Sequence, residues 1–263
     1  MILKVLMLGD MIGRPGRKVL KNNLKSIIGE TEADFVVANG ENASGGAGLL
    51  EPAAKELFEA GVDVITSGNH IWNKKDITRF ISGYPNILRP ANYPEMLPGH
   101  GGGVFLCKNK NIKVGVINIL GRTFMSPIDS PFVAVDKEIS VLRDKGAEII
   151  VVDFHAEATA EKEGMGFYLK DKVELLAGTH THVQTSDEKI LEGKMGYITD
   201  LGRCGSYNSV IGFNENESLK GLLTSVNHKF EPSKSDPVIE GIIAEIDVAS
   251  KRCLKINRLR KFY

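Results

Sequence analysis

The sequence predicts an α/β fold with a mainly parallel sheet, because strand-like apolar runs alternate with helical stretches along the chain. With 42% hydrophobic residues in a chain of 263, there is enough apolar material for a sizeable core. A second observation is that polar side chains able to bind metal follow several of the apolar runs. Ligands of such sheets bind outside the carboxyl ends of the strands, so we expect the functional site there.

The bulk composition excludes several classes of partner. Lys+Arg and Asp+Glu are both 33, so the formal net charge is zero, which argues against bulk binding to nucleic acid but not against a small phosphate ligand. No apolar run approaches the roughly 20 residues of a membrane span, so we expect no membrane partner. Cys107, Cys204 and Cys253 are too scattered for a disulfide framework, which favours a cytoplasmic location.

The first part of the chain contains three strand–helix units. Strands are predicted at 2–8, 35–38 and 62–66. Helices are predicted at 13–28, 51–60 and 73–81. Pro15 suits the first turn of its helix, and Asn73 can cap the third one.

The rest of the chain continues this alternation and closes with antiparallel strands. Further strands are predicted at 104–106, 112–120, 148–154, 175–177, 195–198, 238–246 and 253–259. Helices are predicted at 131–145, before about 168, and at 214–223. The segments 83–103 and 202–206 are predicted as loops, since they are rich in proline or glycine. No linker separates two domains, so 1–263 is predicted as a single domain.

Two histidines follow the apolar run that begins at Leu175. In extended backbone His180 and His182 would project to the same side, so both imidazoles could face one point. Imidazole is a common ligand of transition metals. The alternative is a pair of surface histidines, which is disfavoured because the other candidate ligands also follow apolar runs.

The polar groups at the strand ends are too many for one tetrahedral zinc site. They are Asp10, Glu41, Asn42, Asn69, His70, His155, His180 and His182. Mixed nitrogen and oxygen ligands suit two octahedral-like ions, so iron, manganese or zinc rather than calcium. Two ions that share a carboxylate lie about 3.5–4 Å apart, lower the pKa of a bridging water and hold a phosphoryl group for in-line displacement.

The ordered series of these motifs resembles the calcineurin-like metallophosphoesterases, and more closely their bacterial YmdB-type phosphodiesterase branch. The matching segments are Gly9-Asp10, 39–43, Gly68-Asn69-His70, 89–92, 153–159 and 178–185. The resemblance covers essentially the whole chain. It implies an αββα sandwich of two facing mixed sheets and hydrolysis of phosphodiesters, 2′,3′-cyclic nucleotides included.

The resemblance also implies a role for each site residue. One metal ion, with iron or manganese preferred over zinc, would be held by Asp10, Glu41, Asn42 and His182. The other would be held by Glu41, Asn69, His155 and His180, with Glu41 as the catalytic bridge. His70 would be the catalytic acid that protonates the leaving oxygen.

Two arginines are candidates for contact with the substrate phosphate. Arg122 follows a strand end and matches a Gly-Arg pair of the branch, which favours it over a surface salt bridge. For Arg203, a substrate contact and a solvated loop position are equally supported. Glu157 could support the histidine ligands or simply start a helix.

Some positions depart from the family pattern. The superfamily's Asp-x-His is here Asp10-Met11-Ile12, so Asn42 replaces a histidine, and its bridging aspartate is here Glu41. The acid expected after Asn-His is Ile71, which leaves open what orients His70. Residues 202–206 read Gly-Arg-Cys-Gly-Ser where the branch leads us to expect Gly-Met-Thr-Gly-Pro.

Three functions stay open on these grounds. The leading one is a dinuclear phosphodiesterase that acts on small nucleotides or short RNA ends. A phosphomonoesterase would use the same metal core, and a regulatory protein would bind a cyclic nucleotide with little turnover. The branch resemblance further implies a homodimer or homotetramer.

Overall fold

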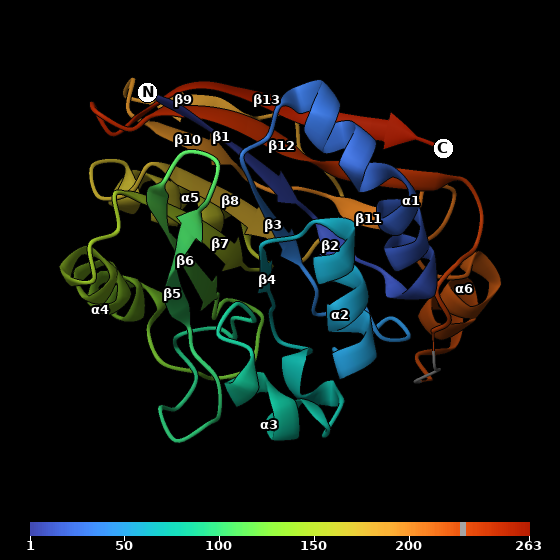
Figure 1. Ribbon diagram of the computed structural model, residues 1–263. Helices are drawn as coiled ribbons and strands as arrows, with labels where there is room; N and C mark the ends of the chain where they lie inside the picture. Colours follow the sequence, from blue (N-terminus) through green and yellow to red (C-terminus); the bar gives the residue numbers. More distant parts are fainter. Residues whose placement is uncertain (227–229) are drawn as a thin grey trace.

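Two mixed β-sheets face each other, and helices cover the outer face of each (Figure 1). The structure is a computed structural model that describes residues 1–226 and 230–263. One core cluster lies between the first sheet and its helices, a second between the two sheets, and a third between the second sheet and its helices. The αββα sandwich implied by the family resemblance is therefore confirmed.

The first sheet has the strand order β2-β11-β12-β1-β3-β4, and β13 pairs with β12. Its strands are β1 (Ile2–Leu8), β2 (Asp10–Met11), β3 (Phe35–Asn39), β4 (Val64–Thr66), β11 (Arg203–Ser206), β12 (Pro237–Asp247) and β13 (Arg252–Phe262). Strands β1, β3 and β4 are parallel, whereas β12 is antiparallel to its neighbours β1, β11 and β13. The parallel part thus brings three strand ends to one edge.

The second sheet has the order β5-β6-β7-β8-β10-β9. Its strands are β5 (Gly102–Cys107), β6 (Ile112–Leu120), β7 (Ile149–His155), β8 (Leu175–Thr179), β10 (Met195–Ile198) and β9 (Lys189–Leu191). The four central strands are parallel and the two edge strands antiparallel. Fully buried runs such as 149–155 are typical of parallel strands that are covered on both faces.

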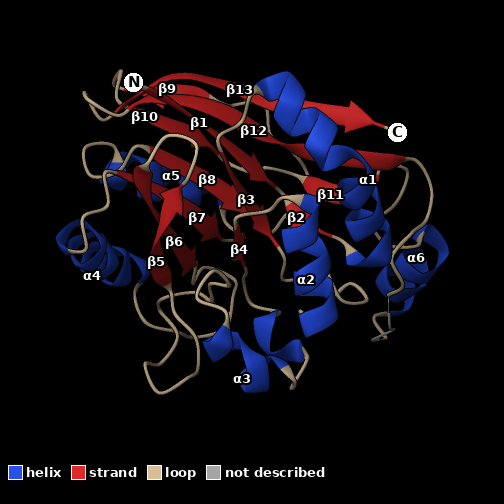
Figure 2. Ribbon diagram, viewed as in Figure 1, coloured by secondary structure: helices blue, strands red, loops and turns tan. Residues whose placement is uncertain are grey.

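The described residues form six α-helices, and helices lie on both outer sides of the sandwich, as Figure 2 shows. They are α1 (Gly13–Thr31), α2 (Glu51–Ala60), α3 (Ile77–Phe80), α4 (Pro131–Asp144), α5 (Thr159–Leu169) and α6 (Glu215–Thr224). α1 and α2 bury an apolar face against the first sheet, and α4 and α5 do so against the second. Asn214 caps α6 by accepting from two backbone N–H groups. Among the described residues, no helix is both long and apolar enough to cross a membrane.

Three details of the predicted elements are wrong. The predicted helix 73–81 is a short α3 between two 3₁₀ turns (Ile71–Asn73 and Ile81–Gly83), and Asn73 caps no helix. The predicted loop 202–206 contains β11, because it pairs with β12 and β2 from distant parts of the chain. The strand predicted at 175–177 continues through Gly178 to Thr179 in β8, and a Cβ at Gly178 would stand 1.9 Å from the carbonyl oxygen of Thr199.

Candidate metal centre

The carboxyl ends of five strands from both sheets meet at one place. Asp10 follows β1, Glu41 and Asn42 follow β3, and Asn69 and His70 follow β4. From the other sheet, His155 is the last residue of β7, and His180 and His182 follow β8. All eight of these side chains belong to one network of hydrogen bonds and ion pairs.

One part of this network consists of Asp10, Asn42 and His182. Asn42 Nδ2 lies 3.4 Å from Asp10 Oδ1 and 3.1 Å from His182 Nε2. His182 Nε2 in turn lies 3.5 Å from Asp10 Oδ1. The Nδ1 of His182 lies 2.9 Å from the carbonyl oxygen of Ile211, to which it donates in the Nδ1–H tautomer. That tautomer leaves the lone pair of Nε2 directed at the other two residues.

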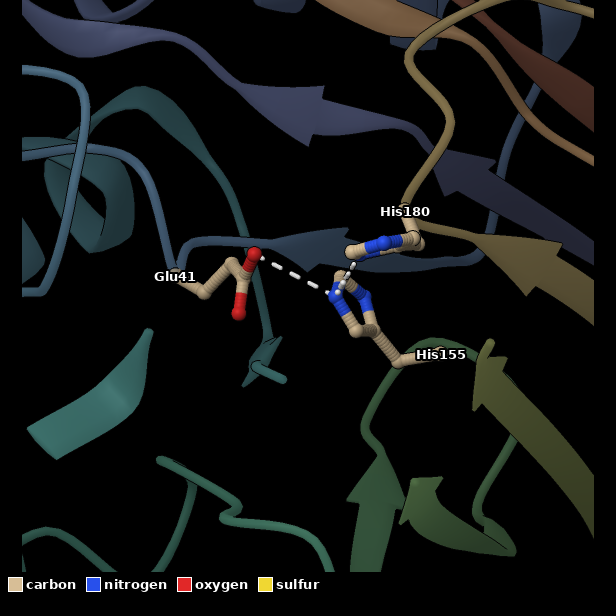
Figure 3. Close-up of side chains that lie close together, drawn as sticks. All are labelled: Glu41, His155 and His180. Carbon is tan, nitrogen blue, oxygen red and sulfur yellow. Dashed lines mark hydrogen bonds and ion pairs between the residues drawn. The ribbon is translucent and has the colours of Figure 1, made fainter. Parts of the chain in front are cut away.

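A second part consists of Glu41, Asn69, His155 and His180. His155 Nε2 lies 3.2 Å from Glu41 Oε1, 3.1 Å from Asn69 Oδ1 and 3.0 Å from His180 Nδ1. Figure 3 shows Glu41, His155 and His180 converging from separate segments of the chain. One ligand atom from each of these three lies within 4.8 Å of the others. Such a spacing of oxygen and nitrogen donors fits a transition-metal ion.

Glu41 joins the two parts. Its Oε1 accepts from Asn42 Nδ2 at 3.2 Å and lies 3.2 Å from His155 Nε2. Its Oε2 accepts from the backbone N–H of His70 at 2.8 Å. The Glu41 side chain is completely buried, so its charge is shielded little by solvent.

His70 sits at the solvent-facing edge of the network. Its Nδ1 lies 2.8 Å from Asn42 Oδ1 and 3.3 Å from Glu41 Oε1. Asn42 and Glu41 thus orient the ring of His70. They take the role of the acid that the family pattern places at position 71, where this chain has Ile71. His70 also lines a cavity of about 690 Å³ together with His180 and His182.

The backbone of the histidine loop is not extended, so the geometric premise for the His180 and His182 pair is wrong. Both residues have positive φ, 106° for His180 and 61° for His182. They nevertheless face one centre because the loop is held in place. The backbone N–H of His180 donates to Asp10 Oδ2 at 3.0 Å, and that of Thr181 donates to Asp200 Oδ2 at 3.1 Å.

Arg203 is buried, so the solvated-loop alternative for it is wrong. Its guanidinium donates to the carbonyl oxygens of His182, Ser206 and Tyr207 at 2.6, 2.9 and 2.7 Å. In this arrangement it is directed into the protein and supports the backbone of His182. Arg122 is exposed and lines a separate cleft beside Glu161, so its predicted contact with substrate stays a prediction.

A buried network behind His155 was not anticipated from the sequence. Thr179 Oγ1 donates to Asp153 Oδ1 at 2.6 Å and lies 2.8 Å from His155 Nδ1. Because the hydroxyl proton goes to Asp153, the hydroxyl oxygen accepts from His155 Nδ1, which leaves Nε2 free for the centre. Asn39 Nδ2 also donates to Asp153, at 3.0 Å. The sequence feature that indicates this network is Asp153, a carboxylate that stands two residues before His155 in an otherwise apolar strand.

The charges of the centre favour a bound cation. Burial lowers the pKa of His155, but the carboxylates of Glu41, Asp10 and Asp153 outweigh it and raise that pKa to about 9. For His180, burial and then the charge of His155 lower the pKa to about 4. The centre thus favours a proton on His155 and a neutral ring on His180. Because a metal ion binds the same nitrogen lone pairs as a proton does, it can take the place of the proton there.

Comparisons with known proteins identify the family of the chain. A family model described as "YmdB-like protein" matches residues 6–259. The chain belongs to the YmdB-like family. It is 38% identical over 257 residues to the 2′,3′-cyclic-nucleotide 2′-phosphodiesterase of Bacillus subtilis (strain 168). The alignment covers 98% of this chain and 96% of that relative.

Further relatives support the same assignment. A putative phosphatase/phosphodiesterase of Mycoplasma pneumoniae is 35% identical and covers 98% of this chain and 92% of its own length. The crystal structure of a phosphatase from Mycoplasma pneumoniae superposes with a TM-score of 0.91 at 34% identity, covering 100% of this chain and 94% of that one. This member of the YmdB-like family is therefore a phosphoric ester hydrolase, and its fold implies the use of divalent metal ions.

Proposed function

We propose that this YmdB-like protein is a dinuclear metal-dependent phosphodiesterase that hydrolyses 2′,3′-cyclic nucleotides or similar small phosphodiesters. The observation that carries the proposal is the position of Glu41, a buried carboxylate between two sets of ligand side chains. The printed name of the Bacillus relative supports the substrate class.

The residues present fit two metal ions. Asp10, Glu41, Asn42 and His182 would hold one ion, and Glu41, Asn69, His155 and His180 the other. Both sets mix carboxylate or amide oxygen with imidazole nitrogen, the donor chemistry of iron, manganese and zinc rather than calcium. When bound, such ions would supply an activated water and neutralise the charge of the phosphoryl group.

His70 is the residue placed to move a proton. Asn42 and Glu41 engage its Nδ1 from inside the centre, so Nε2 is the nitrogen left for the cavity. A proton held at Nε2 would pass to the ribose oxygen as the phosphoester bond breaks. This step lets a poor leaving group depart as an alcohol.

The cavity also has a wall suited to a nucleobase. Val210, Ile211 and Phe213 form an apolar part of the cavity wall beside His182, and the ring of Phe213 lies 6.4 Å from that of His182. Flat apolar surface beside a polar centre is the usual form of a small-molecule site. A nucleoside could place its base against this wall with its phosphate at the metal ions.

A metal assay combined with a substrate panel tests the proposal. We expect two transition-metal ions per chain and turnover of 2′,3′-cyclic nucleotides and of bis-p-nitrophenyl phosphate. Faster turnover of p-nitrophenyl phosphate than of any diester would identify a phosphomonoesterase instead. Tight binding of a cyclic nucleotide without turnover in the metal-loaded protein would identify a regulatory binding protein.

A further inference from the structure

Helix α1 presents a row of positive side chains to solvent. Arg14, Lys18, Lys21 and Lys25 are separated by four, three and four residues, so they lie on one stripe of the helix. All four are exposed, and none forms an ion pair with another described residue. Residues 13–29 contain no aspartate or glutamate. The row is thus a local excess of positive charge in a chain whose net charge is zero.

This row begins beside the metal centre. The cavity over the centre shares Gly45 and Lys74 with an adjoining cleft of about 480 Å³, which Arg14 also lines. That cleft shares Arg14 and Lys234 with a third cleft of about 570 Å³, which reaches Lys18. The three clefts follow one another from the histidines to the exposed face of α1.

The start of α1 adds to the positive potential. Its N-cap residue, Ile12, offers no side-chain hydrogen bond, and its first turn carries no acidic residue. The N–H of Gly13 donates to the carbonyl oxygen of Asn42, so the start of α1 contributes through its helix dipole, whose positive end lies beside Arg14. Lys234, from the segment that precedes β12, faces the same cleft as Arg14 and has no ion-pair partner among the described residues.

We propose that the three clefts and the cation row of α1 form a track for the backbone of a single-stranded oligoribonucleotide whose 2′,3′-cyclic phosphate end lies at the metal centre. This inference rests on the proposed function and names a larger substrate for the same site. From Arg14 to Lys25 the row spans about 16 Å at the helical rise, the length of a few nucleotides. Such contacts bind phosphates regardless of sequence.

A membrane surface is the competing partner for a basic helix, and the packing of α1 argues against it. A helix that binds a bilayer needs a free apolar face. The apolar face of α1 packs against the first sheet, where Leu20, Leu24 and Ile27 are fully buried and Ile28 is partly buried. The outward face of α1 carries the cationic stripe and polar residues such as Asn22 and Ser26, and the stripe leads to a site for phosphodiester chemistry.

The net charge of zero excludes bulk nucleic-acid binding but not this track. Affinity here would come from a few phosphates next to one catalytic site. For three phosphate contacts on a single strand, the log–log dependence of affinity on salt should have a slope of about −2. Removal of the cations should flatten that slope.

Binding to an oligonucleotide tests the track without relying on catalysis. A 5′-fluorescein-labelled eight-nucleotide RNA with a 2′,3′-cyclic phosphate end is titrated with metal-free protein and followed by anisotropy. For R14E/K18E/K21E we expect Kd to rise by at least about tenfold and the salt slope to fall toward zero. K108E makes the same kind of charge change on the exposed turn between β5 and β6, outside these clefts, and should bind like the wild type.

If circular dichroism shows that the triple variant is unfolded, the single variants K18E and K21E replace it. Each of them has a smaller expected rise in Kd. Equal binding by the wild type and the charge-reversed variants would overturn the proposal. So would binding to phosphatidylglycerol vesicles that the reversal abolishes while RNA binding stays unchanged, since the row would then serve a membrane.

Turnover separates this inference from the proposed function. In the metal-loaded enzyme, the reversal should lower kcat/KM for the cyclic-ended RNA by about tenfold or more while kcat/KM for a 2′,3′-cyclic mononucleotide stays within about twofold. Equal losses on both substrates would overturn the track. If the wild type hydrolyses neither substrate, the proposed function fails, and the anisotropy result alone decides whether the track binds RNA.

Discussion

The guanidinium Nη1 of Arg203 donates to the main-chain carbonyl oxygen of His182 over 2.6 Å. His182 has a φ of 61°, a left-handed conformation that costs free energy in a residue other than glycine. Two further donors of Arg203 engage the carbonyl oxygens of Ser206 and Tyr207. One buried cation therefore ties the loop of a proposed metal ligand to strand β11.

Replacing Arg203 with methionine should loosen this loop. The substitution removes the Arg203 hydrogen bonds to three carbonyl oxygens, of which that of Ser206 keeps a donor in Ser209 Oγ. A buried carbonyl group left without any donor costs about 1–3 kcal/mol. We expect a lower free energy of unfolding and a metal content that falls toward one ion per chain, measured by denaturant titration and elemental analysis. R122M, which changes an exposed arginine, should leave both quantities unchanged. Full metal content and unchanged stability in R203M would show that the support is dispensable.

Gly68 lies so close to the proposed ligands His155 and Glu41 that a single methyl group would disturb them. A Cβ there would stand 2.2 Å from Cδ2 of His155 and 2.5 Å from Oε2 of Glu41. Both side chains are buried and cannot move aside freely, so G68A should lose metal and at least about tenfold in kcat/KM.

The matched control is G29A, at an exposed position in α1 where a Cβ meets nothing within 4 Å. It should raise the stability by roughly 0.5–1 kcal/mol, because alanine is the better helix former, with activity unchanged. A G68A enzyme as active and metal-rich as G29A would contradict the close approach.

Glu41→Ala should cost occupancy of both metal ions, because one carboxylate serves both proposed sites. Asp10→Ala and His155→Ala should each empty mainly one site. Elemental analysis after dialysis against a weak chelator would measure this difference. Two ions per chain and full activity in the Glu41→Ala protein would disprove the bridging assignment.

Local signals were sufficient to predict where the proposed ligand residues lie in the fold. Asp10, Glu41 and His155 each end an apolar run, and parallel strands bring such ends to one edge. The conformation of His180 and His182 could not be predicted in this way. It depends on Asp10, Asp200 and Arg203, which lie far from that loop in the sequence.

Long-range pairing also explains the wrong prediction for 202–206. Glycines at 202 and 205 suggest a loop, yet Cys204 pairs with Ile239 in β12 and with Met11 in β2. A local sequence pattern does not reveal strand-pairing partners that lie so far away in the sequence. For the same reason the sequence leaves Arg203 open between a substrate contact and a solvated loop position, because its three carbonyl acceptors come together only in the folded chain.

Cys107, Cys204 and Cys253 should all be free thiols that react slowly in the native protein. All three are buried, and burial raises the pKa of Cys204 to about 12 and that of Cys253 to about 11. Because the thiolate is the reactive form, a thiol reagent at neutral pH should label the folded protein slowly and all three thiols after denaturation. An intramolecular disulfide found by mass spectrometry would count against the reducing compartment predicted from the sequence.

His70 should be needed for proton transfer but not for metal binding. Both proposed metal sites have their ligands without it, so His70→Ala should retain the metal content of the wild type. Its expected contribution, protonation of the leaving oxygen, is typically worth about 10²–10⁴-fold. That contribution matters only when the leaving group is a poor one.

Two substrates with different leaving groups isolate this role. A ribose alkoxide needs the proton, whereas p-nitrophenolate departs without it. The His70→Ala enzyme should therefore lose far more activity on a 2′,3′-cyclic nucleotide than on bis-p-nitrophenyl phosphate. Equal losses on both, with the metals retained, would mean that His70 binds the phosphate instead. Loss of metal would make it a ligand, which its 3.3 Å approach to Glu41 Oε1 would then explain.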